Sequence, residues 1–279
     1  MAAVTRAAPR RKARRSGGPG GVVVAVALAV APRAALAVDA FEIQVYDGTA
    51  NPAGAPGLEL HVNDVVRGLT TAPAPELAPN HQVHFTLEPS YGVTPYWELG
   101  GYLQSALRAD GAFDFAGAKL RSKLVTTRVW SSRARLGVNL EVSGLPRSYE
   151  ADGWSLEIRP IVACDLGPLR LAANPIVDVS LTGGGASFEP AAQALYEVPG
   201  VVSVGLEYYA GLGGLVHLHA LREQAHYLYE VANLLRVRSF ELNVGVGEGL
   251  TAASNAFVAK LILGYVLERR PRVGGVTSR

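Results

Sequence analysis

Charged side chains recur at every second position along several segments of this 279-residue chain. Lys119, Arg121 and Lys123 form one such set, and Arg133 and Arg135 form the next. Because successive side chains of a β-strand point to opposite faces, charges at alternate positions lie on one face of a strand. Charges gathered on one face of a sheet can bind or guide charged solutes through their electrostatic field.

The residues predicted to share an inward-facing surface include both signs of charge. The basic members are Lys119, Arg121, Lys123, Arg133, Arg135, Arg159, Arg170 and Lys260. The acidic members are Glu98, Glu141, Glu157, Asp178, Glu207 and Glu241. Two arrangements remain open. In the first, the basic residues of 119–135 form a wall that faces Glu98, Glu207 and Glu241 across a pore and orients charged solutes. In the second, opposite charges pair and fill the interior.

Other chemistry has weaker support in the sequence. Cys164 is the single cysteine, which excludes an intrachain disulfide and a CxxC site. His217 and His219 form an HxH pattern without a third assured ligand, so we expect ordinary loop histidines. The glycines of GVGEG (245–249) lack the GK[ST] ending of a phosphate loop. We therefore predict no metal, cofactor or catalytic centre.

Period-two alternation recurs from Phe41 onward, broken by Gly, Pro, Asn, Asp and Ser, and this pattern is typical of strands. A short strand is predicted at 41–46 (FEIQVY). Twelve long strands follow, at 57–69, 80–89, 95–108, 112–126, 132–144, 153–164, 168–182, 187–198, 201–212, 223–234, 237–248 and 255–267.

The length of these segments favours a membrane barrel over a soluble sandwich. Strands of soluble proteins usually have about five or six residues, whereas a tilted strand that crosses a bilayer needs about 9–11. Twelve is an even number, as single-chain bacterial barrels require. The composition agrees, since apolar residues make up 49% of the chain and charged residues only 18%, against about 25% in soluble domains.

Residues 1–37 have the features of a signal peptide. A basic region ends at Arg15, an apolar run covers 21–31, and a small-residue cleavage site follows at Ala35–Ala37. We expect a periplasmic leader at 38–56, a barrel at 57–267 and a basic tail at 268–279. Without its first fifteen residues the chain is slightly acidic, so no nucleic-acid partner is indicated.

Four segments carry a family resemblance: 84–103 (HFTLEPSYGVTPYWELGGYL), 136–142 (LGVNLEV), 154–162 (WSLEIRPIV) and 174–181 (NPIVDVSL). Together they resemble the bacterial outer-membrane barrel proteins grouped as transporter-like, or as the MetA-pathway phenol-degradation group. The resemblance implies an outer-membrane barrel, often supposed to be a channel, whose substrate is unassigned. Unlike most such barrels, the last predicted strand is followed by a basic tail rather than ending the chain on an aromatic residue.

The sequence thus predicts an all-β protein, a transmembrane antiparallel up-and-down barrel of about twelve strands in the cell outer membrane. Its expected partners are outer-membrane lipid, the barrel-assembly machinery and a small polar solute. The expected function is porin-like passage of small polar or charged solutes. A closed structural or adhesive barrel is the first alternative. An outer-membrane hydrolase is the second and least favoured, because no G-x-S-x-G motif occurs.

Overall fold

The computed structural model describes residues 39–126, 133–237 and 239–267. Its first six strands are β1 (Pro56–Arg67), β2 (Val83–Thr94), β3 (Trp97–Leu107), β4 (Phe113–Val125), β5 (Ala134–Gly144) and β6 (Trp154–Leu166). The next five are β7 (Leu169–Asn174), β8 (Val177–Ser180), β9 (Ala186–Phe188), β10 (Ala191–Val198) and β11 (Val202–Gly211). The 3₁₀ turn η1 (Leu221–Glu223) precedes β12 (Ala225–Val237), β13 (Phe240–Gly249) and β14 (Phe257–Val266).

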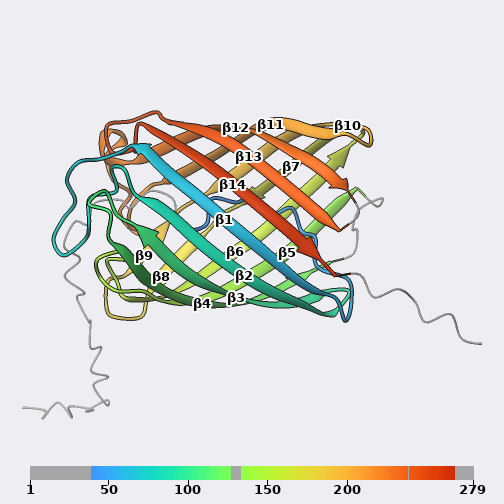
Figure 1. The fold of residues 1–279 in the computed structure, drawn as a ribbon, viewed down its shortest axis with the longest axis horizontal. Coiled ribbons are helices and arrows are strands. Elements are labelled where there is room, and N and C mark those ends of the chain that lie inside the picture. Colours follow the sequence, from blue (N-terminus) through green and yellow to red (C-terminus); the bar gives the residue numbers. More distant parts are fainter. Residues whose placement is uncertain (1–38, 127–132, 238, 268–279) are drawn as a thin grey trace, which may run out of the picture. The chain divides into compact units, whose positions relative to one another are not determined.

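These strands close into a ring. Consecutive strands pair antiparallel except β7 with β8 and β9 with β10. β6 pairs with both β7 and β8, β7 pairs with β10, and β1 pairs with β14. Figure 1 shows β1 lying between β14 and β2 along the wall. The result is the predicted closed barrel of 12 antiparallel strands, because β7 with β8 and β9 with β10 each occupy one place in the ring.

Proline causes both interruptions of the ring strands. β6 pairs with β7 near one end and with β8 near the other, and Pro175 separates β7 from β8. Pro190 likewise separates β9 from β10. Proline has no N–H to donate to a strand ladder, so the regular pairing stops at these positions.

The two faces of the wall differ as the alternation predicts. Leu120 is 73% exposed, whereas its neighbours Lys119 and Arg121 are 7% and 5% exposed. The outward face is apolar and the inward face carries the buried charges, as in membrane barrels. Among the described residues, no helix is long and apolar enough to cross a membrane.

Most connections are shorter at one end of the barrel than at the other, and the β4–β5 connection, 126–133, is the exception. One end has the short turns 95–96, 167–168 and 199–201, and there β1 begins and β14 ends. The other end has the longer connections 68–82, 145–153 and 212–224. These are called the short-turn end and the long-loop end below.

Two details of the sequence prediction are wrong. The segment 41–46 is not a strand, and β2 continues through Pro89 to Thr94 instead of ending at 89. The first difference matters most for the site. The residues that precede β1, called here the leader (39–55), bury Phe41, Ile43, Val45 and Tyr46 inside the barrel.

The expected signal peptide, 1–37, and the expected basic tail, 268–279, lie outside the described residues.

Candidate functional site

One group of buried charges lies on β2, β3 and β4 near the short-turn end. Arg121 Nε donates to Glu88 Oε1 at 2.8 Å, and its Nη2 lies 2.7 Å from Glu98 Oε1. Lys123 Nζ lies 3.0 Å from the same Glu98 oxygen. Gly100 faces Arg121 in the strand register, and a Cβ at Gly100 would lie 2.8 Å from Arg121 Nε. A glycine at this position therefore lets the guanidinium lie across β3.

A second group lies deeper, on β4, β5 and β6. Arg159 binds Glu157 through two bonds, Nε to Oε1 at 2.6 Å and Nη2 to Oε2 at 3.0 Å. Lys119 Nζ lies 3.7 Å from Glu141 Oε2. Tyr102 OH also donates to Glu141, at 3.1 Å. Two-point pairing of a guanidinium with a carboxylate is the geometry that best offsets the cost of burying both charges.

The leader adds two carboxylates to this second group. Asp39 is bound by Lys119 Nζ, and Glu42 Oε1 accepts from Arg159 Nη1 at 2.9 Å. The Tyr46 hydroxyl lies 2.7 Å from the Tyr102 hydroxyl. Wall cations thus bind acidic groups of the leader as well as those of the wall.

Side chains of the wall also satisfy the backbone of the leader. Its carbonyl oxygens accept bonds from Asn63 on β1, Thr86 on β2, Arg135 on β5, Arg159 on β6, Asn174 on β7 and Lys260 on β14. Buried backbone groups need such partners, and here they come from side chains instead of a strand ladder. A segment that contacts strands all round a closed ring must lie inside it.

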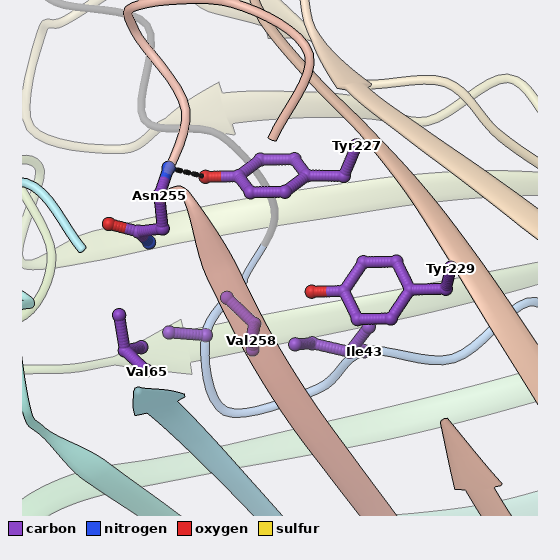
Figure 2. A pocket seen from close by; sticks show the side chains of 7 residues that line it. Ile43, Val65, Tyr227, Tyr229, Asn255 and Val258 are labelled. Atoms are coloured by element: carbon purple, nitrogen blue, oxygen red, sulfur yellow. Dashed lines mark hydrogen bonds between the residues drawn. The ribbon is translucent and has the colours of Figure 1, made fainter. Parts of the chain in front are cut away.

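The opposite side of the lumen is aromatic. Tyr209 on β11 and Tyr229 on β12 meet edge to face, with ring centroids 5.4 Å apart. Figure 2 shows Ile43 of the leader beside Tyr229 and Val258. The void enclosed there measures about 10 Å³, roughly the space of one water molecule. The leader therefore fills most of the space between these residues.

One buried cation lies among these rings. Lys260 Nζ lies 2.5 Å from Glu207 Oε2 and donates to the Ile43 carbonyl at 3.0 Å. Tyr209 OH also donates to Glu207, at 2.6 Å. The leader is thus held from both sides of the lumen.

Glu98, which was predicted to face the basic wall across the pore, lies beside that wall. Glu98 pairs with Lys123 directly across the β3–β4 register, and Glu207 pairs with Lys260. Glu98 and Lys123 meet because adjacent strands bring opposite charges within contact. Lys260 on β14 reaches Glu207 on β11 past the two strands that lie between them in the ring. Opposite charges thus pair inside the barrel both between neighbouring strands and between strands that are farther apart.

The remaining predicted site residues lie nearer the ends of the strands. Arg135 Nη2 donates to Asp165 at 3.0 Å. Arg170 pairs with Glu197 through a side chain that is 42% exposed. Asp178 is half-buried and accepts a bond from Ser155 at 3.0 Å. Arg133 and Glu241 are exposed, so they do not belong to the buried ion-pair groups.

Sequence reasoning missed Asp39 and Glu42, because both were placed in a periplasmic leader and not in the lumen. It also did not place His61 among the inward-facing charged residues. The ligand atoms of Glu59, His61 and Glu88 lie within 4.8 Å of one another, which a metal ion could bridge. Glu88 is bound by Arg121 as well, and His61 Nε2 lies 3.2 Å from Glu88, so an ion pair accounts for this cluster equally well.

The ring of His226 on β12 is hydrogen-bonded by neighbouring side chains. The His226 ring bonds Tyr208 OH at 2.5 Å and Gln224 at 3.1 Å. In the described ranges no serine hydroxyl is hydrogen-bonded to a histidine ring.

Comparison with known proteins places the fold. The chain is similar to the KdgM porin, with a TM-score of 0.52 and 8% identity, over 76% of this chain and 99% of that one. It is also similar to the NanC porin, with a TM-score of 0.50 and 10% identity, over 76% of this chain and 100% of that one. No family model matches the sequence, and no curated protein does. The fold is therefore that of outer-membrane barrels, while membership of the resembled group stays a prediction.

Proposed function

We propose that this protein is an outer-membrane channel of the porin type that passes small polar or charged solutes. One observation carries the proposal, namely that the inner face of a closed barrel is lined with ionised side chains. Replacing buried ion pairs by packed apolar residues is often neutral or stabilising. Stability alone therefore gives no reason for a barrel to keep Arg121, Lys119, Arg159 and Lys260 in its lumen, whereas passage of polar solutes does.

The outward face supports the placement in a membrane. Leu103, Phe115 and Leu120 are more than half exposed, and such residues are stable only against lipid when they cover the whole wall. Outer-membrane lipid and, during biogenesis, the barrel-assembly machinery are the partners that this placement requires. The short-turn end would face the periplasm and the long-loop end the exterior.

The solute path would run between the charged strands β2–β6 and the aromatic strands β10–β12. A solute with a charged end and an apolar end would be oriented by these two sides. A structure of the KdgM porin in complex with disordered oligogalacturonate also exists, and that ligand is known for the neighbour alone.

The test is conductance of the refolded mature protein in a planar bilayer under a KCl gradient. We expect discrete steps, and we expect Lys123→Gln with Arg135→Gln to change the anion-to-cation permeability ratio by about twofold or more toward cations. Their side chains are 12% and 15% exposed, which makes them accessible to lumenal ions. Arg108→Gln is the matched control, because Arg108 lies outside the strands and pairs with Asp110. The proposal would be contradicted if neither the intact protein nor a barrel freed of its leader conducted ions.

A further inference from the structure

We propose that the leader is a displaceable plug which occupies the solute site of the barrel, and that solutes displacing it carry carboxylates. This inference rests on the proposed function and concerns the regulation and substrate class of the same site. It begins from the position of Asp39, Glu42 and Tyr46, which lie among the lumenal cations and rings.

The wall keeps its charge balance when the leader leaves. Lys119 retains Glu141, Arg159 retains Glu157, and Lys260 retains Glu207. Each of these three cations thus has a carboxylate partner on the wall itself. Breaking one partner of a buried pair costs several kcal/mol only when the remaining charge is left alone. The barrel is therefore built to stand with or without the leader, which a permanent part of the core would not need.

The direction of the leader determines how it can leave. Phe41 packs with Ala106, Ala116 and Leu145, which belong to the long-loop end. Residues farther along the leader lie near the short-turn end, since Gly54 N donates to the Gly92 carbonyl and Thr49 is exposed. The chain thus enters at the short-turn end and its first residues lie deepest. Cleavage after Ala37, as the sequence predicts, would make the deep end a free terminus that can slide in or out without threading a longer chain through the barrel.

The leader also shows which ligand chemistry the site accepts. Its carboxylates at 39 and 42 bind Lys119 and Arg159, and the Tyr46 ring lies 4.5 Å from the Arg159 guanidinium carbon. A solute that competes for these cations must present anionic oxygens, because ionised donors bind ionised acceptors most strongly, and the leader presents them as carboxylates. The class of solute that follows is a small dicarboxylate or a short acidic chain.

A reversible tether tests the plug. A Cβ at Gly48 would lie 2.9 Å from Arg135 Cβ, so a small outward shift brings Gly48→Cys and Arg135→Cys to the roughly 3.5–4.5 Å of a disulfide. Cys164→Ser removes the native thiol. We expect the oxidised protein to stay silent in a planar bilayer and the same protein to show openings after reduction. Each single-cysteine variant should conduct equally in both redox states.

A protease site inserted between Pro52 and Ala53, both exposed, separates failure of this inference from failure of the proposed function. The folded protein is cleaved, and release of the leader peptide is followed by mass spectrometry. If the oxidised tethered protein conducts as well as the reduced one, the plug is overturned while the channel stands. If the barrel freed of its leader is silent too, the proposed function is overturned.

The solute class has its own readout on the reduced tethered protein. Succinate is expected to raise the fraction of time open severalfold at concentrations at which succinamide, its uncharged counterpart, has no effect. An equal response to both compounds would remove carboxylates from the proposal and leave only the plug.

Discussion

The charged side of the lumen, formed by β2–β6, and the aromatic side, formed by β10–β12, hold the same leader by different chemistry. On the charged side the leader is bound by ion pairs, as between Arg159 and Glu42 at 2.9 Å. On the aromatic side it is held by packing, with Ile43 against Tyr229. β12 lies across the ring from β4, because as many strands separate them in one direction as in the other.

This difference assigns the choice of occupant to one side of the lumen and the tightness of its packing to the other. Ion pairs depend on exact partners and are expensive to break singly, whereas apolar contacts tolerate changes of shape that preserve volume. The charged side is therefore expected to determine which groups can replace the leader. The aromatic side is expected to determine how tightly any occupant fits. Substitutions on each side can test this division.

The largest effect is expected on the charged side. Arg159 is 2% exposed and binds both Glu157 and Glu42. Arg159→Met leaves two buried carboxylates without their cation, so we expect the free energy of unfolding to fall by about 3–5 kcal/mol. Urea titration of the barrel refolded in lipid vesicles measures it. Arg170→Met is the matched control, because its pair with Glu197 is partly exposed and should contribute at most about 1 kcal/mol. Equal losses for the two variants would show that Arg159 is not the centre of the charged side.

A smaller effect is expected on the aromatic side. Gly247 pairs with Tyr229 across the β12–β13 register, and a Cβ at Gly247 would overlap the Tyr229 ring. Gly247→Val must therefore move the ring, which should lower the free energy of unfolding by about 1–3 kcal/mol and increase release of the leader after cleavage. Gly264→Ala is the control, since its nearest neighbour atom would be 3.5 Å away, an ordinary contact. If Gly247→Val leaves leader release unchanged, Tyr229 does not help to hold the plug.

Much of the fold could be predicted because strands of a barrel leave a strong local pattern. Leu120 between Lys119 and Arg121 shows both the strand and its two environments. The same rule failed for 41–46. The sequence FEIQVY alternates like a strand. Both of its faces are nevertheless buried, because the charged side chains of the wall surround one face and the aromatic rings of the lumen surround the other. Its backbone partners, such as Asn174 and Lys260, come from positions far away in the chain, which periodicity cannot reveal. A strand at 41–46 would have been the thirteenth, and single-chain bacterial barrels have an even number of strands. This parity was the one sequence signal that 41–46 is not part of the barrel wall.

The candidate site was predictable residue by residue but not in its pairing. The inward direction of Arg121, Glu98 and Glu207 followed from alternation. Which charges meet depends on the register between strands, for example Glu98 beside Lys123. A one-residue shift of register would change every such pair, and no local pattern of one strand determines its register against the next.

The smallest change in stability is expected on the outer face of the wall, which contacts lipid and not the leader. Glu230 lies on the outward face of β12, between Leu206 and Val246 in the register, in a shallow groove of about 570 Å³. A carboxylate facing lipid at mid-strand is unfavourable, by less than the roughly 2–4 kcal/mol of a lysine or arginine there. Glu230→Leu should therefore stabilise the barrel in vesicles by about 1–2 kcal/mol. Glu248 also faces outward but lies near the end of β13. Glu248→Leu should change stability by less than about 1 kcal/mol, because the cost of a carboxylate that faces lipid falls toward the membrane interfaces. A loss of stability in Glu230→Leu would mean that this part of the wall contacts a polar group instead of lipid.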